Sequence, residues 1–353
     1  MSPKIPGSLT YPEIGSQAEA LAAARAQLHR QDAWIDRYLR AAYDEVVFIG
    51  SGSSYYQAQT MAATFREWLG RSAIALPSSE LFLFRETAVR RDAKRVLVVG
   101  VSRSGESTEV ILALEAVQSL PGWSTCGITC HETSKLYAIA DSLLSPKGKE
   151  ESTVMTKSFS SMTYMMQCAI AAASGDAAHD AELRRVEAAC ADVTARADLA
   201  AKRIVDTYDL NKFIYLGMGA YYGLAQEASL KIKEMSYVWT EAFGTLEFRH
   251  GPKSIVEPGT LVVAFVSEAA RAYELKVAEE MKGYGATVLL LVERSGDDTA
   301  FADETFVVGG AGVGDAARAS AYMPLVQYLG YYTALKRGLD PDHPRNLTQV
   351  VKI

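Results

Sequence analysis

Continuous apolar runs alternate with amphipathic segments along most of the chain. Runs such as residues 96–101 and 261–266 are apolar throughout, which is typical of parallel strands covered on both faces of a sheet. Segments such as residues 55–69 and 107–117 lie between such runs and carry apolar residues at helical spacing. This alternation of strands and helices predicts a doubly wound α/β fold.

The alternating pattern occurs twice. Residues 48–59 align without gaps to residues 215–226, and Gly50 aligns with Gly217. We therefore predict two tandem, doubly wound parallel-sheet lobes of the flavodoxin-like kind, related by an internal repeat. Two further strand pairs support the repeat: 96–102 with 261–267, and 124–128 with 287–292. The expected boundaries are residues 1–42 for an N-terminal helical segment, 43–175 for the first lobe, 176–198 for a connecting helix, 199–340 for the second lobe and 341–353 for a C-terminal tail.

Composition and charge narrow the class of protein. Of the 353 residues 49% are hydrophobic and 22% charged, which argues against long disordered segments, and the net charge of −6 argues against a general nucleic-acid binder. The four cysteines and five histidines lack metal-ligand spacing, so we expect buried, reduced thiols and no metal. Residues 1–7 lack the apolar core of a signal peptide, and the charge-free run 158–175 opens with hydroxyl side chains. We expect a buried helix at that run, and a soluble, cytoplasmic protein with no membrane partner.

Hydroxyl residues follow two strands of the first half, at the point where each strand ends. The turns are Gly-Ser-Gly-Ser-Ser at residues 50–54 and Ser-Arg-Ser-Gly-Glu-Ser at residues 102–107. Ligands of open α/β sheets bind at this edge, where helix N-termini offer unpaired N–H groups and partial positive charge. One such serine would be an N-cap or turn residue, but two serine-rich turns at equivalent points favour phosphate. The candidate phosphate ligands are Gly52, Ser53, Ser54, Ser102, Arg103, Ser104 and Ser107.

Two alternatives bear on this anion site. A dinucleotide site would need a third glycine where Tyr55 stands, so the first turn does not favour one. At the matching turns of the second half the hydroxyls are replaced, for example by Met218 and Glu268. We therefore expect only the first half to bind the anion.

A second group of polar residues lies on one expected helix. Glu227, Lys231 and Glu234 stand at i, i+4 and i+7 and so share a face. A carboxylate among apolar neighbours has a raised pKa, which suits a general base. The same spacing is also typical of a weak Glu–Lys ion pair on the surface of a helix, and the spacing alone favours this second interpretation. His250 precedes Gly-Pro, so the backbone holds it in place, although a lone histidine is often structural.

Together these motifs resemble the sugar isomerase (SIS) domain family, and within it the isomerase half of the glucosamine-6-phosphate synthases (glutamine–fructose-6-phosphate aminotransferases). The similarity runs from about Ile14 to the C-terminus. The motifs that carry it are Ser102–Ser107, Lys157–Phe159, Glu227-x-x-x-Lys231-x-x-Glu234, His250–Pro252 and Pro344–Leu347.

The resemblance implies a phosphosugar aldose–ketose isomerase that needs no metal or redox cofactor. Glu234 matches the glutamate that moves a proton between sugar carbons 1 and 2. His250 matches the histidine that opens the sugar ring, and it reaches in from the neighbouring subunit of a homodimer. Glu227 and Lys231 match supporting polar residues, and Arg103 replaces a glutamine of the synthases. The serines that match phosphate-binding positions are Ser54, Ser102, Ser104 and Ser107, and sugar contacts are expected from Thr153, Arg345 and Gln349.

Two departures from the synthases change the expected reaction. The chain starts directly with the isomerase part, so we expect no ammonia from glutamine by that route. Gln349 stands where the synthases have an imine-forming lysine, glutamine cannot form a Schiff base, and Lys352 would need a different tail path. We therefore expect isomerisation or deamination of an amino-sugar 6-phosphate. A fructosamine-6-phosphate deglycase and a non-catalytic phosphosugar sensor are the alternatives.

Overall fold

The computed structural model describes residues 5–308 and 312–351 and forms two compact units. The boundaries expected for the lobes differ from these units and stay a prediction about the repeat. The first-sheet unit comprises Ser16–Glu151, Lys157–Glu187 and Thr348–Ile353, and the second-sheet unit comprises Met1–Gly15, Ser152–Thr156 and Ala188–Leu347.

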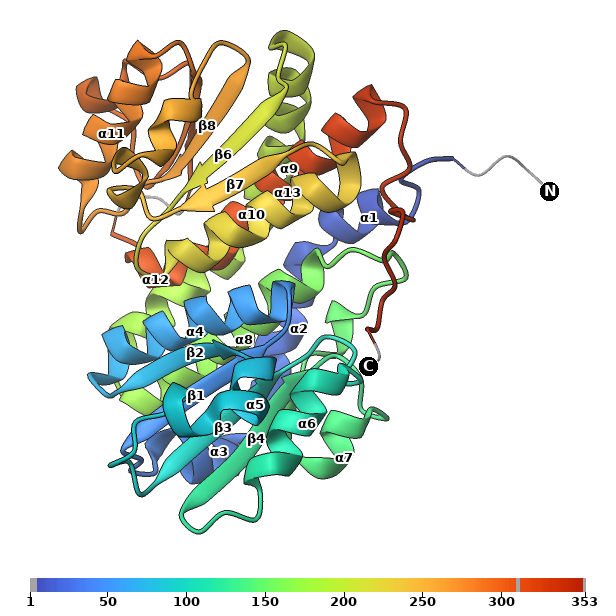
Figure 1. The fold of residues 1–353 in the computed structure, drawn as a ribbon, viewed down its shortest axis with the longest axis vertical. Coiled ribbons are helices and arrows are strands. Elements are labelled where there is room, and N and C mark those ends of the chain that lie inside the picture. The colour runs from blue at the N-terminus through green and yellow to red at the C-terminus, as the bar shows by residue number, and fades with distance from the viewer. Residues whose placement is uncertain (1–4, 309–311, 352–353) are drawn as a thin grey trace. The chain divides into compact units, whose positions relative to one another are not determined.

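The first-sheet unit is a five-stranded parallel sheet in the order β2-β1-β3-β4-β5 (Figure 1). Val47 of β1 faces a core with α5 and α6, whereas Phe48 packs its ring against Phe65 of α4 on the other face. Helices therefore cover both faces of the sheet. The strands are β1 (Glu45–Gly50), β2 (Ala73–Pro77), β3 (Val96–Val101), β4 (Trp123–Thr129) and β5 (Ser142–Leu144). The helices are α2 (Gln17–Leu28), α3 (Asp32–Trp34), η1 (Ile35–Arg40), α4 (Ser53–Leu69), α5 (Ser78–Ala88), α6 (Thr108–Val117), α7 (Lys135–Ile139), η2 (Pro146–Gly148) and α8 (Lys157–Ser174).

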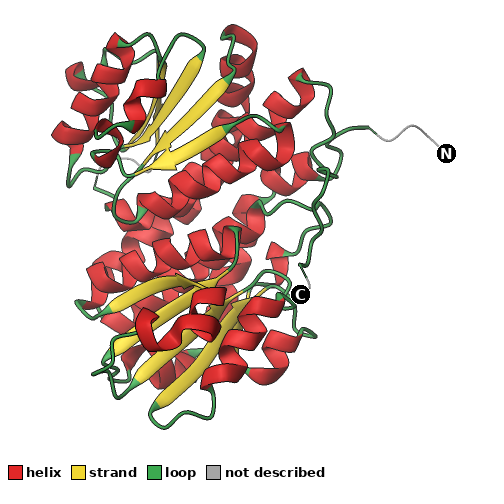
Figure 2. Cartoon of the chain, in the orientation of Figure 1, coloured by secondary structure: helices red, strands yellow, loops and turns green. Residues whose placement is uncertain are grey.

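The second-sheet unit is also a five-stranded parallel sheet, in the order β10-β9-β8-β6-β7. In both units the strands, drawn in yellow, lie among helices, drawn in red (Figure 2). Counted from the start of each repeat, both sheets have the strand order 2-1-3-4-5, which is the flavodoxin-like order that the internal repeat predicts. The strands are β6 (Lys212–Leu216), β7 (Thr240–Phe243), β8 (Thr260–Phe265), β9 (Thr287–Val292) and β10 (Glu304–Val307). The helices are α1 (Thr10–Gly15), α10 (Tyr221–Ser236), η3 (Glu247–Arg249), η4 (Pro252–Ile255), α11 (Arg271–Gly283), η5 (Asp297–Thr299), α12 (Asp315–Arg318), η6 (Ala319–Tyr322) and α13 (Met323–Lys336), while α9 (Ala177–Thr207) contributes residues to both units.

The charge-free run forms α8, and every residue from Ser158 to Ala171 is buried, which confirms the expected buried helix. Across the described residues, no helix combines the length and the apolar character needed to span a bilayer. All four cysteines are buried and none forms a disulfide. Within residues 5–308 and 312–351, no group of His, Cys, Asp and Glu side chains is arranged to hold a metal ion.

Candidate active site

The two serine-rich turns leave the same edge of the first sheet. Strands β1 and β3 pair in parallel, with Ile49 opposite Gly100, so the turns at residues 51–54 and 102–107 start side by side. This is also where the strand order reverses, the point at which doubly wound sheets bind ligands. Ser53 and Ser54 are buried in the first turn of α4.

Side-chain hydrogen bonds shape the turn between β3 and α6. Ser102 Oγ accepts a bond from Gly105 N (3.0 Å) and lies 3.1 Å from Ser107 Oγ, while Ser104 Oγ accepts from Glu106 N (3.1 Å). Gly105 has a φ of +67°, and a Cβ there would lie 2.1 Å from a neighbouring serine hydroxyl oxygen. Only glycine fits this conformation and this spacing, so the turn holds its backbone N–H groups in a fixed array.

The guanidinium of Arg103 is not freely available to an external phosphate. It is 8% exposed, and its Nη1 lies 3.0 Å from Glu150 Oε2, whose side chain is fully buried. Glu150 also accepts bonds from Ser158 N (3.0 Å) and Ser158 Oγ (2.7 Å) at the start of α8. A neutralising carboxylate therefore stands beside the predicted phosphate ligand. Sequence reasoning missed Glu150, because no motif marks it and only the fold brings it to Arg103.

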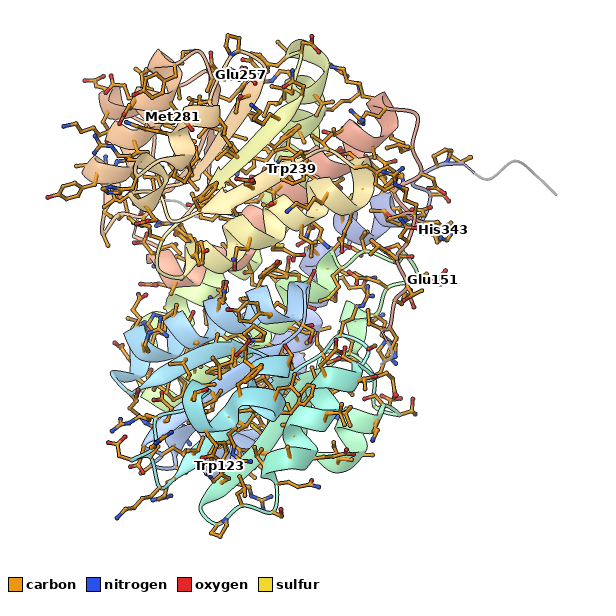
Figure 3. The ribbon with its side chains drawn as sticks, in the orientation of Figure 1. Trp123, Glu151, Trp239, Glu257, Met281 and His343 are labelled. Carbon is orange, nitrogen blue, oxygen red and sulfur yellow. The ribbon has the colours of Figure 1, made fainter. Side chains whose placement is uncertain are left out.

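Of the expected sugar-contact residues, Arg345 and Gln349 lie in the C-terminal tail and Thr153 lies in a loop. Gln349 Nε2 donates to the carbonyl of Glu151 (2.9 Å, with Glu151 labelled in Figure 3), and Arg103 Nη2 donates to the Gln349 carbonyl (3.5 Å). In the second-sheet unit, Thr153 N donates to the Asp342 carbonyl (3.2 Å). The predicted alternative, Lys352, lies outside the described residues.

Glu227, Lys231 and Glu234 form a buried cluster on α10. Lys231 Nζ lies 3.2 Å from Glu227 Oε1 and donates to Glu234 Oε2 at 2.5 Å. The side chains of Glu227 and Lys231 are fully buried, and Glu234 is 16% exposed. The interpretation as a weak surface ion pair is therefore wrong, because water reaches only the outer carboxylate.

The cluster is electrostatically coupled. Burial alone would lower the pKa of Lys231, but the carboxylates of Glu227 and Glu234 outweigh it and raise that pKa above its usual value. The ammonium stays charged and holds Glu234 in place. Helix α13 packs closely here, since a Cβ at Gly330 would lie 3.2 Å from the carbonyl of Lys231.

Glu234 opens onto a hollow of about 430 Å³ within the second-sheet unit. Trp239, which is labelled in Figure 3, is 71% exposed at its wall. The tail forms another wall, where Arg345 N donates to the hydroxyl of Tyr237 (2.7 Å) and the Arg345 guanidinium lies 4.2 Å from the Tyr237 ring centre. A candidate base thus faces a cavity large enough for an organic group.

His250 lies at the end of the short helix η3. Phe248, two residues earlier, is fully buried and anchors η3 in the core, while His250 itself is exposed. The histidine is not among the residues that line the hollow beside Glu234. His250 therefore lies on the surface of this chain, and its expected role in opening the sugar ring stays a prediction.

The matching turn of the second half is occupied by the protein's own carboxylates. Glu274 Oε2 accepts bonds from Ser267 N (2.6 Å) and Ser267 Oγ (2.8 Å), and Asp315 accepts from the backbone N–H groups of Glu268 (2.9 Å) and Ala269 (3.2 Å). Burial raises the pKa of Glu274 to about 7, against the lowering effect of the bonds from Ser267. These donors already bond to the protein's own carboxylates, and the expectation that only the first half binds the anion stays a prediction. Sequence reasoning did not find either carboxylate.

The chain matches the SIS domain family over residues 39–172 and 208–307. It is 30% identical to the glutamine–fructose-6-phosphate aminotransferase of Pyrobaculum aerophilum, an alignment that covers 97% of this chain and 57% of that protein. The chain spans about half the length of the aminotransferases that it matches.

Two relatives are closer to this chain in length. A Streptomyces coelicolor protein, named for a proposed D-galactosamine-6-phosphate deaminase activity, is 29% identical over 94% of this chain and 86% of its own. The crystal structure of a Thermotoga maritima glucosamine-6-phosphate deaminase superimposes with a TM-score of 0.78 and 30% identity, and covers 98% of this chain and 99% of that one. Since the family match covers more than half of the residues and includes strands of both sheets, the chain belongs to the SIS domain family, in which its relatives are sugar-phosphate isomerases and deaminases.

Proposed function

We propose that the chain is an aldose–ketose isomerase of amino-sugar 6-phosphates that also releases the amine. The observation that carries the proposal is the buried Glu227–Lys231–Glu234 cluster, whose outer carboxylate alone meets solvent. Such a carboxylate is positioned by a neighbouring cation and is suited to carry a proton between adjacent carbons. The names of the two deaminase relatives support an amino sugar as substrate.

In the proposed reaction the sugar phosphate binds at the turns of residues 51–54 and 102–107, and His250 of a second copy assists ring opening. Glu234 removes the proton from carbon 2 of the open-chain 2-amino aldose and delivers it to carbon 1. The product is the carbon-2 imine of the ketose. Water adds to that imine and ammonia leaves, so the ketose phosphate forms without any oxidant or reductant. The substrate brings its own nitrogen, so no protein Schiff base is needed at Gln349.

The homodimer and the cytoplasmic location stay predictions from the sequence. The exposed position of His250 supports a role across a subunit boundary. Sedimentation tests this role, because an active monomer would contradict it.

The Glu234→Gln variant tests the proton transfer. We expect kcat for glucosamine 6-phosphate to fall by roughly 10²–10⁴-fold, the usual contribution of a general base, while sugar-phosphate binding persists. Glu279→Gln is the matched control, because Glu279 is an exposed carboxylate of α11. Released ammonia and ketose phosphate are measured over a panel of hexose and hexosamine 6-phosphates. If the parent binds these compounds and converts none, the chain is a phosphosugar sensor.

A further inference from the structure

The tail segment that walls the hollow beside Glu234 has few contacts of its own. Residues 345–347 line the hollow, and every residue from 345 to 349 is exposed. The bond from Arg345 N to the Tyr237 hydroxyl is also exposed. Segments with few buried contacts open easily, so the wall depends on the residues that precede it. Of these, Asp342 and Pro344 are buried.

The carboxylate of Asp342 binds the start of α1. Its Oδ1 accepts a hydrogen bond from Thr10 N (2.8 Å), and its Oδ2 accepts one from Leu9 N (3.0 Å). Asp340 Oδ1 accepts a further bond from Gly7 N (3.0 Å). Asp342 is only 3% exposed. N–H groups at the start of a helix have no partner within the helix, and hydrogen bonds to a carboxylate are strong. The tail is therefore anchored on α1.

Helix α1 is itself fixed in the second-sheet unit. It packs against α13 (Figure 1), where the ring of Tyr11 lies 5.7 Å from that of Tyr328 and 5.4 Å from that of Tyr331. Just before α1, Gly7 has a φ of +76°, and a Cβ there would lie 2.4 Å from the Tyr331 ring, so only glycine fits. Helix α13 in turn packs against α10, which carries Glu234. A continuous set of packed elements thus connects the tail anchor to the candidate base.

The same helix also holds the loop that carries Thr153. Glu13 of α1 is 8% exposed, and its carboxylate accepts bonds from Ser152 N (3.2 Å) and from the Ser152 hydroxyl. Thr153 N donates to the carbonyl of Asp342 (3.2 Å). Loop and tail are therefore joined to each other and to α1 by buried carboxylates.

We propose that Asp342 and Glu13 are positioning residues of the candidate active site. Asp342 holds the tail wall of the hollow, and Glu13 holds the loop at Thr153, so both segments are in place before the sugar binds. A segment that is ordered in advance does not spend binding energy on being ordered. The inference rests on the proposed function, because the sugar must lie beside Glu234 for these segments to contact it.

Two variants at Asp342 test the tail anchor. Asp342→Ala removes both bonds to α1, whereas Asp342→Asn keeps one acceptor oxygen. With the best substrate of the hexose and hexosamine 6-phosphate panel, we expect Asp342→Ala to raise KM by about tenfold or more, the usual effect of losing a hydrogen bond to a charged group. Asp342→Asn should lie between Asp342→Ala and the parent. We expect kcat to change by less than about threefold, because Lys231 rather than the tail holds Glu234.

Variants at Glu13 test the loop anchor. Glu13→Ala removes both bonds from Ser152, and Glu13→Gln keeps an acceptor for one of them. We expect KM to rise more in Glu13→Ala than in Glu13→Gln, again with little change in kcat. Binding of inorganic phosphate, measured by calorimetry, should stay as in the parent in all four variants. The turns expected to bind phosphate include neither carboxylate, so a variant that merely unfolds would lose phosphate binding as well.

Trypsin reports the position of the tail without any substrate. The bond after Arg345 should be cleaved roughly tenfold faster in Asp342→Ala than in the parent, because the segment opens more often. Cleavage after Arg294, an exposed arginine of the same unit, should not change. Mass spectrometry of the fragments measures both rates in one sample, and an unchanged rate at Arg345 would contradict the tail anchor.

Asp44→Ala is the matched control. Asp44 Oδ2 accepts bonds from two successive backbone N–H groups, those of Lys94 (2.8 Å) and Arg95 (2.9 Å), so its replacement removes the same kind of contact. It lies just before β1, at the opposite end of that strand from the serine-rich turns. We expect this variant to keep the KM of the parent.

The outcomes separate the inference from the proposed function. If KM in Asp342→Ala and Glu13→Ala stays within about threefold of that in Asp44→Ala, the inference is wrong and the proposed function stands. If phosphate binding is lost together with the sugar, the effect is general unfolding and the inference is also wrong; where an alanine variant does not fold, Asp342→Asn and Glu13→Gln decide. If the parent binds sugar phosphates but converts none, the proposed function falls, and dissociation constants replace KM in the same comparison. If the parent binds none of them, both fall.

Discussion

Replacing Lys231 with methionine tests the cluster on α10 by removing its one cation. Methionine keeps most of the length and apolar stem of lysine, so packing against α13 changes little. What changes is the charge around Glu227, whose side chain is fully buried and lies 3.2 Å from the ammonium. The variant leaves this carboxylate in the core without its neighbouring cation.

Two energies set an upper limit on the stability that the Lys231→Met variant loses. At 3.2 Å and an effective dielectric of about 20, the lost attraction is roughly 5 kcal/mol. However, Glu227 can instead take up a proton, and protonating a carboxyl at pH 7 from its ordinary reference pKa costs only about 3–4 kcal/mol. Glu227 adopts whichever state costs less, and that is the protonated one. We therefore expect Lys231→Met to reduce the free energy of unfolding by about 3–4 kcal/mol at pH 7. The loss shrinks toward pH 5, where protonation is easier.

Urea denaturation at pH 5 and pH 8 measures the loss, and amide hydrogen exchange along α10 measures it locally, since a chain of two units need not unfold in one step. The double variant Glu227→Gln with Lys231→Met removes the buried charge and should recover at least half of the stability. Lys202→Met is the control, because its ion pair with Asp206 is exposed and is worth less than about 1 kcal/mol. A loss below about 1 kcal/mol at pH 8, or a double variant less stable than the single one, would refute the reasoning.

Three further predictions follow from buried or sterically confined groups. Burial raises the pKa of Glu274 from 4.5 to about 7, so the parent protein loses stability as the pH rises between these values. The Glu274→Gln variant should therefore be more stable than the parent by up to about 3 kcal/mol at pH 8 and equally stable below pH 4.5. Urea denaturation that gives the same stability difference between variant and parent at both pH values would contradict this. The Gly105→Ala variant should no longer bind inorganic phosphate in calorimetry, because the Cβ of the new alanine has no room in the turn. Gly175→Ala is the control: Gly175 also has a positive φ (+72°), but nothing lies within 4 Å of its Cβ position. This control has only the backbone strain of about 1 kcal/mol and should still bind phosphate. Glu150→Gln removes the carboxylate beside Arg103, so it should lower stability by roughly 3–5 kcal/mol and tighten phosphate binding, and an unchanged phosphate affinity would show that Arg103 does not contribute.

Much of the fold could be predicted because it depends on local patterns of apolar and polar residues in the sequence. Strands such as residues 96–101 are buried on both faces and therefore apolar throughout, and this makes them visible without any partner. The strand order 2-1-3-4-5 in both sheets agrees with the internal repeat. The shared face of Glu227 and Glu234 follows from helical spacing alone. Burial of that face did not follow, since the same spacing is common on helix surfaces.

The residues that sequence reasoning missed are those that act through long-range contacts. Glu150 reaches Arg103 across 47 positions, and Asp315 reaches the N–H group of Glu268 across another 47. Neither carboxylate belongs to a motif, because a single acidic residue in a loop or short helix carries no periodic signal. Their effect on the two turns comes entirely from how the chain returns to the edge of each sheet.

The sequence by itself determined the two repeated sheets, the serine turns at one edge of the first and the three charged residues along one helix. Helical and strand periods are local properties of the chain, so the amino-acid order is enough to specify them. Only the tertiary structure decided which charges are neutralised and which cavity Glu234 faces. Burial and the distances between charges depend on segments such as α10 and the tail at Arg345 that are far apart in the chain, and charge interactions depend steeply on both.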